Sequence, residues 1–120
     1  LGAAGVRVAL VSGGIRQAIL PLARPLGIDP RDVHAVDVVL DTGGGYFAFD
    51  AGSPLATQHG KRAVADALVA GTLGAPPLAR PVLAVGDGAT DLAMKPAVDA
   101  FAAFTGVATR DAVVRGADHV

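Results

Sequence analysis

The chain has 120 residues, which is enough for one domain with a modest hydrophobic core. Hydrophobic residues make up 52% of it and charged residues 18%, a composition typical of a folded protein. The net charge of −1 and the lack of long apolar runs argue against nucleic acid and membrane partners. The lack of cysteine excludes disulfides and thiolate metal sites.

The first half of the chain predicts a strand, a helix and a hairpin. Residues 6–11 are apolar and bounded by Gly5 and Ser12, as in a buried strand. Apolar residues then recur with a helical period over 15–26, in a helix that Pro21 should kink or shorten and Gly27 should end. Residues 34–40 and 46–49 predict two strands of a β-hairpin that turns at three consecutive glycines.

The second half continues the alternation of helices and strands. Its predicted elements are a helix over 61–69, a strand over 82–85, a helix over 90–98, a strand over 100–104 and a helix over 110–116. Apolar strands alternating with helices predict an α/β fold with a parallel sheet. We therefore expect ligands beyond the carboxyl ends of the strands.

Ser12-Gly13-Gly14 follows the first predicted strand and precedes the first helix. A hydroxyl group beside free backbone N–H groups can bind an anion, most often a phosphate. The alternative is a serine that caps the helix beside a glycine turn. Lys61 begins the next helix, where it could meet an anion or simply be solvated.

Asp87 follows a buried strand directly, and Asp91 lies in the first turn of the next helix. Two carboxylates near a phosphate suit Mg²⁺, which keeps several waters and needs few protein ligands. Gly86 and Gly88 would let the backbone approach closely. The alternative is a helix cap at Asp91 and a turn at Asp87. A dinucleotide site is disfavoured because Asp91 stands where the third glycine of that motif would be.

The order of these motifs resembles the haloacid dehalogenase-like hydrolases, and more narrowly the phosphoserine phosphatases among them. The resemblance rests on "SGG", "GGGYFAFD", "HGKRAVADAL" and "VGDGATDLAMKPAVDAFAAFTG", and it covers about residues 5–120. It implies a Rossmann-like three-layer core, a Mg²⁺ cofactor and phosphoserine hydrolysis through an aspartyl-phosphate in serine biosynthesis. It makes Lys61, Asp87 and Asp91 catalytic residues, with Asp87 a metal ligand and Asp91 supporting the metal's water shell and Lys61.

The same resemblance makes Ser12, Gly13, Gly14, Lys61 and Thr90 the residues that bind the phosphate. It also implies a first motif, Asp-x-Asp-x-Thr/Ser, that supplies the nucleophile and the general acid, followed by a helical cap. No Asp-x-Asp occurs in this chain. We therefore interpret residues 1–120 as a partial hydrolase core without its first strand and cap, and expect it to be inactive alone.

Several alternatives stay open. The chain could belong to another phosphatase or phosphotransferase of the superfamily, or act as a non-catalytic binding module. The missing strand would lie between the strands that end at Ser12 and Asp87. Arg16 is predicted to face solvent, Arg110 to be structural, and the three histidines to be surface or edge residues (His34, His59 and His119). No export signal is visible, so we expect a cytoplasmic protein.

Overall fold

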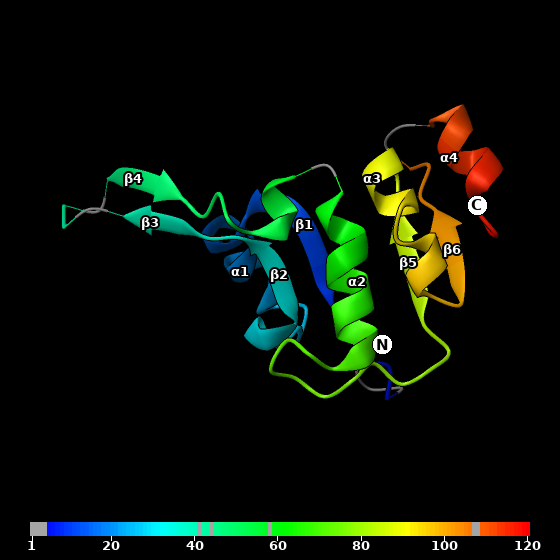
Figure 1. Ribbon diagram of the computed structural model, residues 1–120, viewed down its shortest axis with the longest axis horizontal. Helices are drawn as coiled ribbons and strands as arrows, with labels where there is room; N and C mark the ends of the chain where they lie inside the picture. The colour runs from blue at the N-terminus through cyan, green and yellow to red at the C-terminus, as the bar shows by residue number, and fades with distance from the viewer. Residues whose placement is uncertain (1–4, 41, 44, 58, 107–108) are drawn as a thin grey trace. The chain divides into compact units, whose positions relative to one another are not determined.

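A computed structural model of the chain describes residues 5–40, 42–43, 45–57, 59–106 and 109–120. The chain divides into two compact units, Leu1–Gly60 and Lys61–Val120. The described residues form short parallel strand pairs, helices and one antiparallel hairpin (Figure 1). The predicted α/β class is confirmed.

The first unit is built on a parallel pair of strands joined through a helix. β1 (Leu10–Ile15) pairs with β2 (Val33–Val36), and α1 (Arg16–Ala23) lies between them in the chain. A 3-10 turn, η2 (Pro30–Asp32), leads into β2. The apolar side chains that this arrangement buries are Ala23, Val33, Val36 and Leu55.

The helix α1 ends earlier than the apolar period predicts. It runs through Pro21 and stops at Ala23, because Pro25 has no N–H to donate to the Pro21 carbonyl and continue the helix. Gly27 has a φ of 72° and closes the turn that follows, where its N–H donates to Arg24. The predicted helix end at Gly27 is therefore wrong, because residues 24–27 form a turn beyond the end of α1.

The position of Ser12-Gly13-Gly14 corrects the sequence interpretation. These residues lie inside β1, not between a strand and a helix, and residues 6–9 are not part of the strand. The register with β2 is irregular between Val11 and Ile15, as expected of a bulge that glycines permit. The helix cap is Ile15, without a side-chain hydrogen bond, so the alternative of a Ser12 cap is wrong.

The predicted hairpin is present, but it is separate from the strand before it. β3 (Val38–Leu40) pairs antiparallel with β4 (Tyr46–Phe49), whereas β2 ends at Val36 and pairs with β1. Gln17 of α1 fixes this junction: its Oε1 accepts the Val38 N–H at 3.0 Å and its Nε2 donates to the Val38 carbonyl at 3.2 Å. The side-chain amide thereby takes the place of a neighbouring strand. Figure 1 shows the hairpin as a ribbon that continues from β2.

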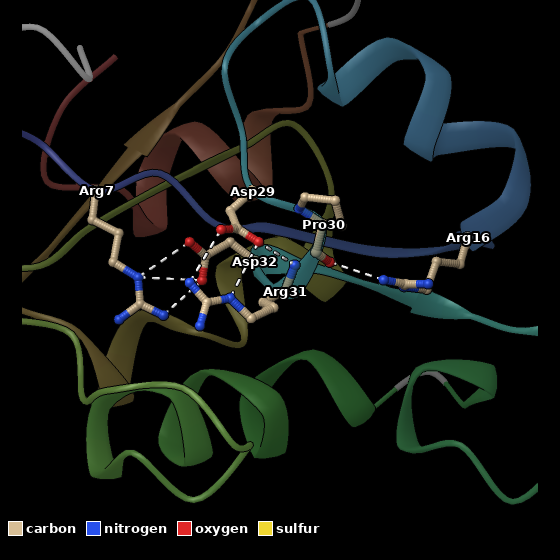
Figure 2. A network of polar contacts seen from close by, with 6 residues as sticks. All are labelled: Arg7, Arg16, Asp29, Pro30, Arg31 and Asp32. Atoms are coloured by element: carbon tan, nitrogen blue, oxygen red, sulfur yellow. Dashed lines mark hydrogen bonds and ion pairs between the residues drawn. The ribbon is translucent and has the colours of Figure 1, made fainter.

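A network of charged side chains holds the chain before β1 against η2 (Figure 2). Asp32 is buried, and the Arg7 guanidinium donates to both of its carboxylate oxygens, with 2.6 Å between Arg7 Nη2 and Asp32 Oδ1. Asp29 caps η2 by accepting the Arg31 N–H at 2.9 Å. Because two donors of one guanidinium meet one carboxylate, this pair fixes orientation as well as distance.

In the second unit, β5 (Leu83–Gly86) pairs with β6 (Ala100–Ala103) in parallel and regular register. The helices of this part are α2 (Gly60–Ala70), α3 (Ala89–Leu92) and α4 (Asp111–Gly116). Phe101 of β6 is fully buried. The predicted helix over 90–98 is broken into α3 and a 3-10 turn, η4 (Lys95–Ala97), because Pro96 disfavours helical backbone at the residue before it. Among the described residues, no helix is long and apolar enough to cross a bilayer.

Candidate active site

Lys61 and Asp91 form the centre of the candidate site. Lys61 is the second residue of α2, and Asp91 lies in α3, thirty residues further along the chain. The Lys61 Nζ donates to Asp91 Oδ1 at 2.5 Å, and the two side chains are only 18% and 13% exposed. An ion pair this well shielded from water holds both groups in place far better than an exposed pair would.

The other oxygen of Asp91 organises the turn after β5. Asp91 Oδ2 accepts the Gly88 N–H at 3.0 Å and the Asp87 N–H at 3.2 Å. Asp91 therefore caps α3 and also binds Lys61, whereas its catalytic role stays a prediction. Its two oxygens already have partners within the chain, which favours a positioning role for Asp91.

Gly86 is the residue that allows Asp91 to come so close. A Cβ atom at position 86 would lie 2.2 Å from the Asp91 Cβ, which no side chain can tolerate. A Cβ at Gly88 would lie 3.5 Å from Asp91 Oδ2, an ordinary contact. The prediction that glycine permits a close backbone approach thus holds at Gly86, whereas Gly88 has room for a side chain.

Asp87 lies directly after β5, and its carboxylate is partly exposed. Its side chain is 42% exposed, and its carboxylate has an ion-pair contact with Arg110 at a distance of 3.8 Å. Arg110 Nη1 also donates to the Asp87 carbonyl oxygen at 3.1 Å. Since the residues stand 23 positions apart, no local pattern in the sequence points to this contact.

The carboxylate of Asp87 fits a Mg²⁺ ligand. It is a hard oxygen donor with exposed surface, and Mg²⁺ typically needs only one or two carboxylates besides water and phosphate oxygens. Within the part of the chain that the structure describes, no group of three or more acidic or histidine residues could hold a metal ion. A metal here would therefore need further ligands from water, from substrate or from residues beyond this group.

The remaining predicted site residues are Thr90 and the Ser12-Gly13-Gly14 segment. Thr90 lies on α3, next to Asp91. Ser12, Gly13 and Gly14 belong to the first unit, where Ser12 Oγ accepts the Gly14 N–H at 3.0 Å. The structure brings Lys61, Asp87 and Asp91 together, whereas the meeting of the "SGG" segment with them stays a prediction.

Two side chains of the first unit, Arg16 and His34, are only partly exposed. Arg16 is partly buried and donates to the carbonyls of Val33 at 3.1 Å and Pro30 at 2.8 Å, so it is not simply solvated. His34 is partly buried, and its Nε2 atom is buried without a hydrogen-bond partner. Burial lowers the pKa of His34, which keeps the ring neutral. His34 lies on β2, which pairs only with β1 among the described strands, so the prediction of a surface or edge residue holds as an edge residue.

Curated relatives of the chain are phosphoserine phosphatases. It is 36% identical to "Phosphoserine phosphatase, chloroplastic" of Arabidopsis thaliana over 98% of its own length and 39% of that protein. It is 37% identical to the phosphoserine phosphatase of Drosophila melanogaster, over 99% of its length and 43% of the relative. The human phosphoserine phosphatase is 33% identical over 90% of the chain and 46% of the human protein. The chain thus spans less than half the length of these relatives.

Solved structures share the fold. A phosphoserine phosphohydrolase-like protein from Francisella tularensis matches with a TM-score of 0.77 and 24% identity, over 100% of this chain and 53% of that one. The structure of DsGPDH of Dunaliella salina matches with a TM-score of 0.75 and 30% identity, over 99% of this chain and 19% of that one. The haloacid dehalogenase-like hydrolase family matches residues 1–96. These matches confirm the resemblance, and the chain belongs to the haloacid dehalogenase-like hydrolase family.

Proposed function

We propose that the chain is part of a Mg²⁺-dependent phosphoserine phosphatase, which hydrolyses O-phosphoserine to serine and phosphate in serine biosynthesis. The observation that carries the proposal is the shielded Lys61–Asp91 pair beside the exposed Asp87 carboxylate. The named relatives at 33–37% identity support the same substrate class, a small phosphorylated molecule. A cytoplasmic location is part of the proposal, although one relative is named chloroplastic.

Lys61 would neutralise the charge of the phosphoryl group. Transfer of a phosphoryl group depends mainly on positioning and charge stabilisation, because the charge on its equatorial oxygens must be balanced as the bond breaks. Asp91 holds the Lys61 ammonium group at one place through the 2.5 Å contact. A cation held before the reaction begins needs no reorganisation during it, which is the main source of electrostatic stabilisation.

Asp87 would hold the metal ion. Its carboxylate lies at the carboxyl end of β5, on a turn that Asp91 fixes through the Asp87 and Gly88 N–H groups. When bound, Mg²⁺ would neutralise phosphate charge and orient the transferring group. Ser12, Gly13 and Thr90 would bind the phosphate oxygens, as the family resemblance implies.

The nucleophile and the general acid would come from outside these residues. No Asp-x-Asp occurs among the 120 residues, and the family resemblance implies such a motif. We propose that the transfer passes through an aspartyl-phosphate on a carboxylate that lies elsewhere in the protein. The 120-residue chain alone should then show no turnover.

The test uses the protein that carries these residues and measures phosphate release from O-phosphoserine. Lys61→Ala should lower kcat by about 100-fold or more, because phosphoryl charge is left uncompensated. Asp87→Asn should raise the Mg²⁺ concentration needed for half-maximal activity and lower kcat. Arg62→Ala is the matched control, since the neighbouring Arg62 is 55% exposed and pairs only loosely with Asp66, at 3.8 Å. Near wild-type turnover of either test variant at saturating Mg²⁺ would remove that residue from the proposed mechanism.

A panel of substrates separates the two alternatives. A protein that hydrolyses another small phosphomonoester faster than O-phosphoserine would be a different phosphatase of the same family. A protein that carries these residues and binds phosphate or Mg²⁺ without releasing phosphate would be a binding module. The lack of an Asp-x-Asp in these residues is the observation that keeps the second alternative open.

A further inference from the structure

The C-terminal end of α4 approaches α3 unusually closely. A Cβ atom at Gly116, the last residue of α4, would lie 2.6 Å from Leu92 Cδ2 and 3.1 Å from Leu92 Cδ1. A larger residue at position 116 would therefore require the end of the Leu92 side chain to move. Leu92 follows Asp91 directly on α3, so the end of α4 packs against the residue next to the carboxylate that holds Lys61.

Lys95 joins the same two helices through its ammonium group. It begins η4, which follows α3, and its Nζ donates to the Gly116 carbonyl oxygen at 2.7 Å. The last carbonyls of a helix have no partner inside the helix, and a cation there is favoured by the helix dipole. The same Nζ lies 3.0 Å from Asp118 Oδ1. One side chain thus connects the end of α4 and the segment after it to the turn that follows α3.

Asp118 extends this connection to the sheet. Its Oδ2 accepts the N–H of Phe101, the fully buried residue of β6, at 2.8 Å. That hydrogen bond and the bond from Lys95 lower the pKa of Asp118, so the carboxylate is charged at neutral pH. The next residue, His119, bridges to β6 at Ala102. The segment after α4 is therefore attached both to β6 and to the turn after α3.

These contacts lie next to the Asp87–Asp91 turn in the chain, at Leu92 and Lys95, and reach β6, the partner strand of β5. The turn begins at the end of β5 and ends in α3, and β5 is held by its regular pairing with β6. We propose that Lys95, Gly116 and Asp118 form a C-terminal brace that positions Asp91 and, through it, Lys61. This role rests on the proposed function for its effect on catalysis. Lys95 and Asp118 are positioning residues in this proposal, because neither contacts the Asp91 carboxylate.

The experiment compares Lys95→Met and Gly116→Ala in the protein that carries this chain. Lys95→Met removes the ammonium group and keeps most of the side chain's length, whereas the methyl group of Gly116→Ala pushes against the end of the Leu92 side chain. Arg115→Ala is the matched control, because it removes a cation from the same helix without touching the brace. Lys95→Arg is the conservative variant. Each variant is assayed for kcat and KM on O-phosphoserine and for hydrogen exchange at the Asp87 and Gly88 amides, which donate to Asp91.

A loosened brace should lower kcat by about tenfold, with KM within about twofold of wild type, because misplacing a group that acts on the reacting phosphoryl slows the chemical step. Exchange at the Asp87 and Gly88 amides should accelerate by about tenfold, which reports local opening. The Leu78 amide, bonded to Leu68 within the same unit, should not accelerate equally. Lys95→Arg should retain most of the activity, and Arg115→Ala should match wild type.

Two results would overturn the proposal. Equal acceleration at Leu78 would show general destabilisation, and unchanged exchange at Asp87 and Gly88 in both test variants would show that the brace does not hold the turn. A wild-type protein without phosphatase activity would refute the proposed function instead. The exchange rates would then still decide on the brace, since they do not depend on turnover.

Discussion

Replacing Gly86 by alanine tests whether the close approach of Asp91 is required. The added Cβ would lie 2.2 Å from Asp91 Cβ and 2.6 Å from Asp91 Oδ2. Because ordinary contacts begin near 3.4 Å, Asp91 or the end of β5 must move by about 1 Å. The obstacle is a short side chain that is held at both oxygens, so no flexible chain end can simply swing away.

The cost follows from overpacking. Inserting a methyl group into a closely packed place typically costs about 1–3 kcal/mol of folding free energy. We expect a loss in this range when the unfolding of Gly86→Ala is followed in urea. Gly88→Ala is the matched control on the other side of Asp87, because its nearest contact would be 3.5 Å and its φ of −115° suits alanine. It should cost less than about 1 kcal/mol, which is the scale of a changed helix cap.

The same pair of variants also reports on the site. A displacement of about 1 Å at Asp91 should move the Lys61 ammonium group and lower kcat by about 100-fold under the proposed function. If Gly88→Ala destabilised the protein as much as Gly86→Ala, the argument from Cβ distances would be refuted. Full activity of Gly86→Ala would show that Lys61 does not depend on the position of Asp91.

Two further predictions concern the first unit. Asp32→Ala should lower the free energy of unfolding in urea by about 1–3 kcal/mol. The loss should be smaller than for a fully buried pair, because the Arg7 side chain is 29% exposed. A loss near zero would contradict the role given to this pair. Burial lowers the pKa of His34, so the folded protein favours the neutral ring. The stability of the fold should therefore fall as the pH drops below about 6.5, the pKa of a histidine in an unfolded chain. His34→Gln should show a smaller loss between pH 7.5 and 5.5, and an equal loss in both proteins would refute the assignment.

The sequence predicted most elements of the fold, because apolar periodicity is a local signal. The hairpin and the β5–β6 pair are close to where the pattern placed them, whereas β1 lies at residues 10–15 and not 6–11. The predictions failed where a side chain or a proline decided the backbone. Gln17 separates β2 from β3 by binding Val38, and Pro96 breaks the helix that follows Asp91. Neither effect appears in a count of apolar positions.

The bulge in β1 shows the same limit. A serine followed by two glycines predicts a turn, yet Ser12 stays within the strand and uses its hydroxyl to accept the Gly14 N–H. Glycine tolerates both a turn and a bulge, so the sequence alone cannot decide between them. The pairing of β1 with β2 decides it, because Ile15 still finds a partner in Val36.

Asp91 shows how one residue can both cap a helix and bind a distant cation. A carboxylate in the first turn of a helix predicts a cap, and the cap is present at Gly88. The cap uses one oxygen and leaves the other for Lys61, which stands too far away in the sequence for any local pattern to reveal. The family resemblance, which rests on the order of the motifs, predicted that Asp91 would support Lys61. The fold can therefore place a cation that is distant in the sequence within reach of the second oxygen of a carboxylate that caps a helix.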